Sequence, residues 1–364
     1  EQSFTFTGIA CAPIPSLNRN FGAPIEVQYD YRDEELITLL RHDTDPFNRW
    51  DAAQQLFSRM IISSTNTSEP VLLNDAMVET LQHILRDENL SPAYKTQLLT
   101  LPAFSTLAQK IQRTALLDPQ QLFAARTAIG VALAKQLSAH WPKIYETLND
   151  NVAYRYDGES AGKRSLKNMA LSYWAKSELD SAGAWQNVSQ QYQNSDNMTD
   201  RFAALSIAVE YFAEQADELI QDFYQRYQNE ALVIDKWFSV QATRSSGDFT
   251  GMQTTLQKLL AHPAFANPNP NRLRALVFAF CNMNPHHFHQ KDGAGYRFWA
   301  EQVLAKKTKN PQTASRLARS CENWRLFAEP YQSQMQKALQ HIANAPKLSD
   351  DVSEIVGKAL QLPH

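Results

Sequence analysis

Helical periodicity runs from about Asp33 to the end of the chain, and this pattern constrains the fold more than any other feature. Along three segments, apolar residues recur at spacings of three and four, which places them on one face of an α-helix. The three sets are Trp50, Ala53, Phe57, Met60 and Ile61; Met77, Val78, Leu81, Ile84 and Leu85; and Val352, Ile355, Val356, Ala359 and Leu360. Each face must pack against a partner surface. We therefore predict a mostly α protein.

Several helix starts are written as a polar residue followed by proline. The polar side chain accepts from a free backbone N–H, and proline is tolerated at the first helical position because its missing donor has no partner there. The pairs are Asp45-Pro46, Ser91-Pro92, Asp118-Pro119 and Asn310-Pro311, and Ser349 is a further candidate cap. Their uneven spacing disfavours a strict repeat of about 33 to 45 residues. We predict a large, irregular helical array that resembles an α-solenoid.

Residues 1–32 carry a different pattern, which is typical of strands. Phe4 and Phe6 alternate with threonines, and Ile25, Val27 and Tyr29 alternate with polar residues. Because two strands alone are marginally stable in water, we expect them to complete a sheet whose other strands lie elsewhere. We predict that residues 1–32 contribute strands to such a sheet and that residues 33–364 form an all-α domain. The pattern, with no initial methionine, favours a piece of a longer protein.

Charge and composition exclude several classes of function. The 35 basic and 38 acidic residues give a formal net charge of -3, which supplies no general attraction to nucleic acid or anionic membrane. No stretch approaches the roughly 20 apolar residues that span a bilayer. Cys11, Cys281 and Cys321 are too few and too far apart for a disulfide framework, which favours a reducing compartment. We predict a soluble, cytoplasmic monomer.

Histidine and cysteine form no recognisable catalytic or metal-binding motif. The HExxH signature is absent, and the cluster at residues 286–289 (HHFH) offers two imidazoles at i and i+3 with no third ligand at a suitable spacing. We predict a solvated loop or helix start there and no metal site. Cys281 and Cys321 lie among apolar or helical residues, so we expect buried packing groups rather than nucleophiles.

Glycine and tryptophan patterns indicate no nucleotide or nucleic-acid site. No Walker loop, GxGxxG or GxSxG sequence follows a predicted strand. The two glycines within residues 292–296 predict a turn that tolerates positive φ. No basic residues are interleaved with the tryptophans, so we expect these rings in the core rather than on a stacking platform. They are Trp50, Trp174, Trp185 and Trp237.

Two basic positions stand out on helix geometry. The stripe Leu273, Leu276, Val277 and Phe280 would face the core, which leaves Arg274 free to point into a cavity. In the helix opened by Asn310-Pro311, Gln312 and Arg316 lie one turn apart on one face. A ligand-facing role and an ordinary solvated or ion-paired role both remain open on this pattern alone.

These same runs resemble a known family. Residues 269–276 (NPNRLRAL), 284–296 and 310–317 (NPQTASRL) resemble the C-terminal helical domain of bacterial aminopeptidase N. Further matches follow in the family's order: residues 14–17 (IPSL), 21–24 (FGAP), 48–53 (NRWDAA), 196–200 (DNMTD) and 235–238 (DKWF). The resemblance therefore covers essentially the whole chain.

The resemblance implies a zinc aminopeptidase of the alanyl type, which removes N-terminal residues from peptides. The family's zinc ligands and catalytic groups lie outside the part that this chain matches, so we expect no catalytic residue, no metal ligand and no cofactor in the chain itself. The resemblance also implies that residues 1–32 are the last strands of a small β-sandwich domain. The helical domain would instead cap the catalytic domain of the same enzyme and enclose the peptide substrate. By motif position, Arg274, Gln312 and Arg316 resemble the residues that line this cavity.

A second hypothesis comes from a different class of protein. Irregular helical arrays commonly bind a protein or peptide partner on one face, so a free-standing helical scaffold is the alternative. The strand-like pattern within residues 3–30 favours the first hypothesis, because a scaffold has no need of an incomplete sheet.

Overall fold

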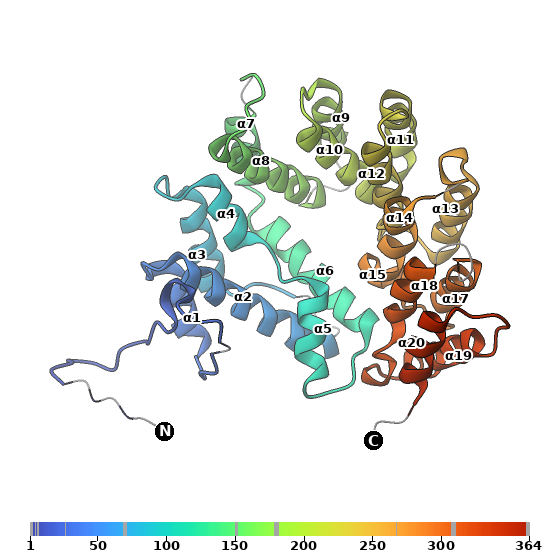
Figure 1. The fold of residues 1–364 in the computed structure, drawn as a ribbon. Coiled ribbons are helices and arrows are strands. Elements are labelled where there is room, and N and C mark those ends of the chain that lie inside the picture. Colours follow the sequence, from blue (N-terminus) through green and yellow to red (C-terminus); the bar gives the residue numbers. More distant parts are fainter. Residues whose placement is uncertain are drawn as a thin grey trace. The chain divides into compact units, whose positions relative to one another are not determined.

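A computed structural model describes residues 3, 5, 7–25, 27–67, 71–149, 152–177, 182–266, 268–306 and 311–361. Helices dominate these ranges, as Figure 1 shows, and this confirms the predicted mostly α architecture. No strand forms within the same ranges, although one isolated parallel bridge joins Leu117 to Phe327. In this part of the chain no helix is both long enough and apolar enough to cross a membrane.

The chain divides into two compact units. Unit 1 comprises Glu1–Pro102 and Ala128–Tyr173, and unit 2 comprises Ala103–Thr127 and Trp174–His364. Two helices, α6 (Pro119–Gln136) and α8 (Gly158–Ser177), contribute residues to both.

Unit 1 is built on a short run of helices that pack on their neighbours in sequence. Its own elements are η1 (Arg19–Phe21), α1 (Asp33–His42), α2 (Pro46–Ser63), η2 (Ser64–Asn66), α3 (Asp75–Arg86), α4 (Pro92–Leu99) and α7 (Trp141–Leu148). Helix α1 packs against α2 and α3, and α2 also packs against α4.

Unit 2 follows the same principle over a longer stretch. Its elements are α5 (Phe104–Gln112), α9 (Ala182–Asn194), α10 (Met198–Tyr211), α11 (Ala213–Tyr227), α12 (Ala231–Ala242), α13 (Phe249–Ala261), η3 (Pro263–Phe265), α14 (Pro270–Leu273), η4 (Arg274–Phe278), α15 (Ala279–Met283), α16 (Pro285–Phe288), α17 (Ala294–Lys306), α18 (Pro311–Ala318), η5 (Arg319–Cys321), η6 (Trp324–Leu326), α19 (Tyr331–Ala343) and α20 (Asp350–Leu360). Helix α10 packs between α9 and α11, and α17 contacts both α18 and α19.

The predicted apolar faces form the core of these packings. Their central residues are buried, while the residues at the margins of each stripe are partly exposed. The buried members are Ala53, Phe57 and Ile61 on α2, Met77, Leu81, Ile84 and Leu85 on α3, and Val352, Val356 and Ala359 on α20. Burial of this size stabilises a helix by roughly 1.5 to 3 kcal/mol for each large side chain.

The predicted helix starts are largely confirmed. The Asp45 side chain accepts from Asn48 N, Ser91 accepts from Tyr94 N, and Asp118 accepts from Gln120 N and Gln121 N. Asn310 lies outside the described residues. Ser349 occupies the N-cap position of α20, but its side chain makes no capping hydrogen bond. The sequence therefore predicts the correct start for α20, but the expected capping hydrogen bond to Ser349 is not formed.

Neither predicted strand is seen in the described residues. Phe4 and Phe6 lie outside the described residues, whereas Ile25, Val27 and Tyr29 are described, are exposed, and belong to no strand. A strand needs a neighbouring strand for its backbone hydrogen bonds. The assignment of residues 1–32 to a β-sandwich domain stays a prediction.

Candidate functional site

Arg274 lies where the sequence pattern placed it, outside a buried stripe. Leu273, Leu276, Val277 and Phe280 are buried, and the Arg274 side chain is exposed. Its Nη1 donates to Oδ1 of Asn271, 3.0 Å away on the preceding turn. The guanidinium therefore keeps further donors available to a ligand.

The backbone at Arg274 departs from regular α-helix. Elements α14, η4 and α15 follow one another without a break from Pro270 to Met283, and η4, which Arg274 begins, is a π-helical turn. Such turns are rare and occur frequently at functional sites. Sequence periodicity gave no signal for this turn, because both flanks keep the ordinary α-helical spacing.

Gln312 and Arg316 lie on α18, and both side chains are exposed. The opposite side of this helix is buried through Ala314 and Leu317, where α18 packs against α17 and α20. The two polar residues thus share a solvent-facing surface of α18. No hydrogen bond among the described residues connects Arg274 to either of them, so a site shared by all three stays a prediction.

A surface cleft of about 430 Å³ is lined by residues of α18 and α20, among which are neither Gln312 nor Arg316. Ser315 and Arg319 border it on one side and α20 on the other, and its lining includes Glu322, Asp351, Glu354 and Lys358. Arg319 pairs with Glu322 at 3.2 Å, and Lys358 pairs with Glu354 at 2.5 Å. The cleft therefore presents mostly charges that are already paired with each other.

The histidine cluster lies at a helix start, as predicted, but two of its three rings are buried rather than solvated. His287 and His289 are buried, and α16 begins at Pro285 with Asn284 as its cap. The reason is tertiary: Asn284 Nδ2 donates to the carbonyls of Ala242 and Arg244 and holds the cluster against that turn. Burial lowers the pKa of His287 to about 4 and that of His289 to about 3, which keeps both rings neutral.

Metal and nucleophile chemistry finds no support in the described part of the chain. No three His, Cys, Asp or Glu side chains within it converge into a group that could hold a metal ion. Cys281 and Cys321 are buried, as predicted, and burial raises the pKa of both thiols, while Cys11 is exposed. A thiol with a raised pKa is a poor nucleophile at neutral pH.

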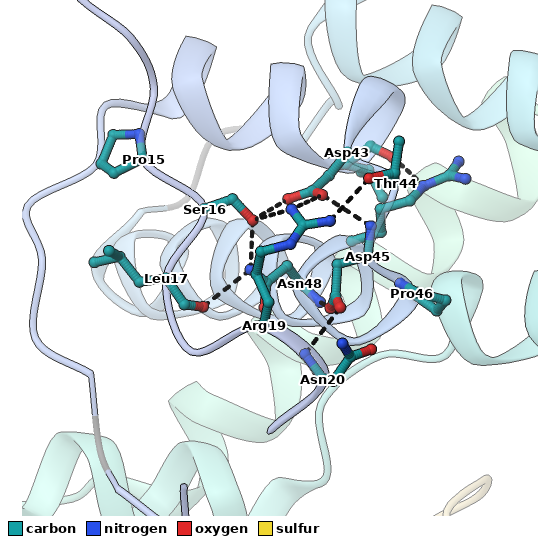
Figure 2. Close-up of polar contacts among 12 residues, drawn as sticks. Pro15, Ser16, Leu17, Arg19, Asn20, Asp43, Thr44, Asp45, Pro46 and Asn48 are labelled. Carbon is teal, nitrogen blue, oxygen red and sulfur yellow. Dashed lines mark hydrogen bonds and ion pairs between the residues drawn. The ribbon is translucent and has the colours of Figure 1, made fainter. Parts of the chain in front are cut away.

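A polar network in unit 1 is not predicted by the sequence, although Ser16 and Asn48 each lie in one of the motifs that carry the resemblance. Figure 2 shows Ser16 and Arg19 pointing toward Asp43. The Ser16 hydroxyl donates to Asp43 Oδ2 at 2.6 Å, and Arg19 Nη1 donates to Asp43 Oδ1 at 2.8 Å. From the other motif, Asn48 Nδ2 donates to Ser16 Oγ and to the carbonyl of Leu17. The network ties residues 15–23 to the turn between α1 and α2.

Asp43 is the electrostatic centre of this network. Burial by itself would raise the pKa of its carboxyl group, but hydrogen bonds from Ser16, from the Asp45 backbone and from Arg19 stabilise the charged form, and the net pKa is lowered. Asp45 adds a second carboxylate, whose Oδ2 accepts from Asn20 N at 2.8 Å. Each carboxylate oxygen of Asp43 and Asp45 accepts at least one hydrogen bond, which is typical of a structural rather than a catalytic group.

Together, the helices define an all-α helical-array domain with exposed polar side chains on α18 and η4. The chain belongs to the family described as "Domain of unknown function (DUF3458_C) ARM repeats", whose model matches residues 33–361.

Named relatives agree with this assignment. Aminopeptidase N of Escherichia coli K12 is 34% identical over 363 residues, and aminopeptidase N of Haemophilus influenzae is 34% identical over 364 residues. Each comparison covers 99% of this chain but 41% of the relative. The chain is thus homologous to the C-terminal helical domain of aminopeptidase N and spans less than half the length of those proteins.

Among solved structures, a crystal structure of Legionella pneumophila aminopeptidase A in complex with aspartic acid is similar to this chain. It superposes with a TM-score of 0.86 at 29% identity and covers 98% of this chain and 42% of that chain. These relationships do not favour the alternative of a free-standing scaffold, because each relative carries the same array within a longer aminopeptidase.

Proposed function

We propose that this chain is the part of a bacterial aminopeptidase that caps its catalytic domain, lines the peptide cavity and controls access to it. The observation that carries the proposal is homology over 99% of the chain to proteins named aminopeptidase N, of which it covers 41%. Peptide substrates, the catalytic domain as partner, the cytoplasm and a monomeric state belong to this proposal. The zinc ion and its ligands belong to the catalytic domain.

Arg274, Gln312 and Arg316 are the residues that we assign to the cavity wall. Their exposed side chains support the assignment, since each keeps donors for a ligand. A guanidinium fork can bind a peptide carbonyl or a C-terminal carboxylate through two parallel hydrogen bonds. The amide of Gln312 adds a donor and an acceptor on the same helix face as Arg316.

The cavity assignment is tested by replacing Arg274 or Arg316 with alanine in the longer aminopeptidase polypeptide. We expect kcat/KM for a pentapeptide to fall about tenfold, with a much smaller change for an alanyl anilide, because only the longer substrate reaches the arginines. Arg297→Ala is the control, since Arg297 is exposed and already bonded to Asp292. Equal losses on both substrates would contradict the assignment.

The absence of chemistry in this chain is tested separately. The purified chain, supplied with zinc, should not hydrolyse an alanyl anilide. Zinc-dependent turnover that survives further purification would overturn the assignment of catalysis to another domain.

A further inference from the structure

Residues 15–23, here called the strap, adopt an unusual backbone conformation. Asn18, Asn20 and Phe21 have φ angles of 49°, 55° and 49°, in the left-handed region. Asparagine tolerates this region, but a bulky residue such as Phe21 adopts it only when the surroundings impose it. The strap therefore needs an external constraint to keep its shape.

The constraint is the acidic turn between α1 and α2. Asp43 accepts hydrogen bonds from Ser16 Oγ and Arg19 Nη1, and Asp45 accepts one from the backbone N–H of Asn20. Inside the strap, the Asn18 side chain bonds Ala23 in both directions at 3.0 Å, and at its start the carbonyl of Pro15 accepts from the Tyr31 hydroxyl. The first half of the strap is thus bonded to other elements of unit 1, and its second half is closed by the Asn18–Ala23 pair.

The strap and the residues beside it in the sequence expose apolar side chains. Leu17 is 39% exposed and Phe21 is 51% exposed, although Phe21 also meets the Phe47 ring at 5.1 Å between centroids. The adjoining residues Ile9, Ile25, Val27 and Tyr29 are exposed as well. Large apolar side chains that gather on a rigid segment mark an interaction surface.

We propose that Asp43 is a positioning residue that holds the strap so that its exposed apolar side chains meet the remainder of the aminopeptidase polypeptide in one orientation. This inference rests on the proposed function, because the relatives are more than twice as long as this chain and so contain further polypeptide that the exposed side chains can contact. A fixed strap sets the orientation of unit 1 relative to that remainder. It therefore affects the entry of long peptide substrates. Asp43 touches no substrate in this scheme.

The strap is tested first in the chain itself, by hydrogen exchange at the amides of Asn20, Phe21 and Ala23. Asp43→Ala should speed their exchange about tenfold or more, because Ser16, Arg19 and the backbone N–H of Asp45 lose the charged acceptor that they share. Ser16→Ala, which leaves the α1–α2 turn intact, should give a smaller change in the same direction. Glu79→Ala is the control, since Glu79 forms an exposed pair with Arg41 in the same unit. Unchanged exchange in Asp43→Ala overturns the inference.

The positioning role is tested in the longer polypeptide. Asp43→Ala should lower kcat/KM for a pentapeptide about fivefold and leave kcat for an alanyl anilide unchanged, with Asp43→Asn recovering part of the loss. Faster exchange without any change in peptide kinetics overturns the positioning role and leaves the proposed function standing. A wild-type polypeptide with no aminopeptidase activity rejects the proposed function, and the inference with it.

Discussion

Arg272 donates from Nε to Oδ1 of Asp235 at 2.5 Å, and the two side chains are only 9% and 15% exposed. The remaining guanidinium donors reach the carbonyls of Ala264 and Ala231, and the guanidinium carbon lies 5.0 Å from the centroid of the Phe238 ring. The pair joins α12 to α14 and thereby fixes the start of the helical run that carries Arg274. Two arginines in one turn thus have opposite environments, one structural and one exposed.

Breaking this pair should be costly. Asp235→Ala leaves the guanidinium buried without its counter-charge, and we expect the free energy of unfolding to fall by about 3 to 5 kcal/mol in urea titrations. Glu322→Ala removes an exposed pair with Arg319 and should change stability by no more than about 0.5 kcal/mol. Similar losses in the two variants would show that burial is not the deciding factor.

Gly295 predicts a second large effect. A Cβ atom at this position would lie 2.0 Å from the carbonyl oxygen of Phe288, so Gly295→Ala must push α17 away from α16. We expect a loss of roughly 2 to 4 kcal/mol, measured by thermal or urea unfolding. Gly357→Ala is the matched control in α20, where nothing lies within 4 Å of the added atom. That variant should gain up to about 1 kcal/mol from helix propensity.

The glycines also illustrate what the sequence could predict. Gly293 has a φ of 76°, as expected for a turn, because that requirement is local. The role of Gly295 depends on a backbone brought in from the preceding helix, and no local pattern encodes it. The buried surroundings of His287 and the Asp235–Arg272 pair escaped prediction for the same reason.

The candidate site also combines local features that the sequence predicts with tertiary features that it does not. Part of it could be predicted, because helical spacing places Arg274 off a buried stripe and puts Gln312 and Arg316 on one face of their helix. The π-helical turn at Arg274 could not, since the apolar spacing on both sides of it is that of an ordinary α-helix; in the structure η4 packs against α12. The hydrogen bonds to Asp43 join residues more than twenty positions apart, and Asp43 lies in no sequence motif, so neither this residue nor its partners could be predicted.

Helix capping offers a milder prediction. Ser91 Oγ accepts from Tyr94 N at 3.3 Å, whereas Ser349 Oγ is buried with no hydrogen-bond partner among the described residues. Ser91→Ala should therefore cost about 1 kcal/mol, and Ser349→Ala should be neutral or slightly stabilising, because it removes an unsatisfied polar group. Urea midpoints at constant slope would separate the two. A loss at Ser349 equal to that at Ser91 would mean that its hydroxyl does cap α20.

Buried neutral histidine gives the protein a predictable sensitivity to acid. The imidazole Nδ1 of His289 lies 2.8 Å from the Tyr296 hydroxyl, and its ring stacks on Phe327 at 5.3 Å between centroids. Burial lowers its pKa to about 3, against about 6.5 in an unfolded chain. The unfolded state therefore binds the proton first as the pH falls, and stability that is complete above pH 6.5 is lost progressively toward pH 3.

His289→Gln tests this linkage through a slope rather than a single stability. Between about pH 5.5 and 4, one such histidine makes the free energy of unfolding fall by about 1.4 kcal/mol for each pH unit. The variant should lose that part of the slope and keep the part due to His287, whose pKa is lowered to about 4. At pH 7.5, above the titration, the difference in the free energy of unfolding between wild type and variant measures the packing cost of removing the ring. Parallel pH profiles for the two proteins would mean that His289 is already protonated in the folded state, because only a histidine that stays neutral on folding contributes to the slope.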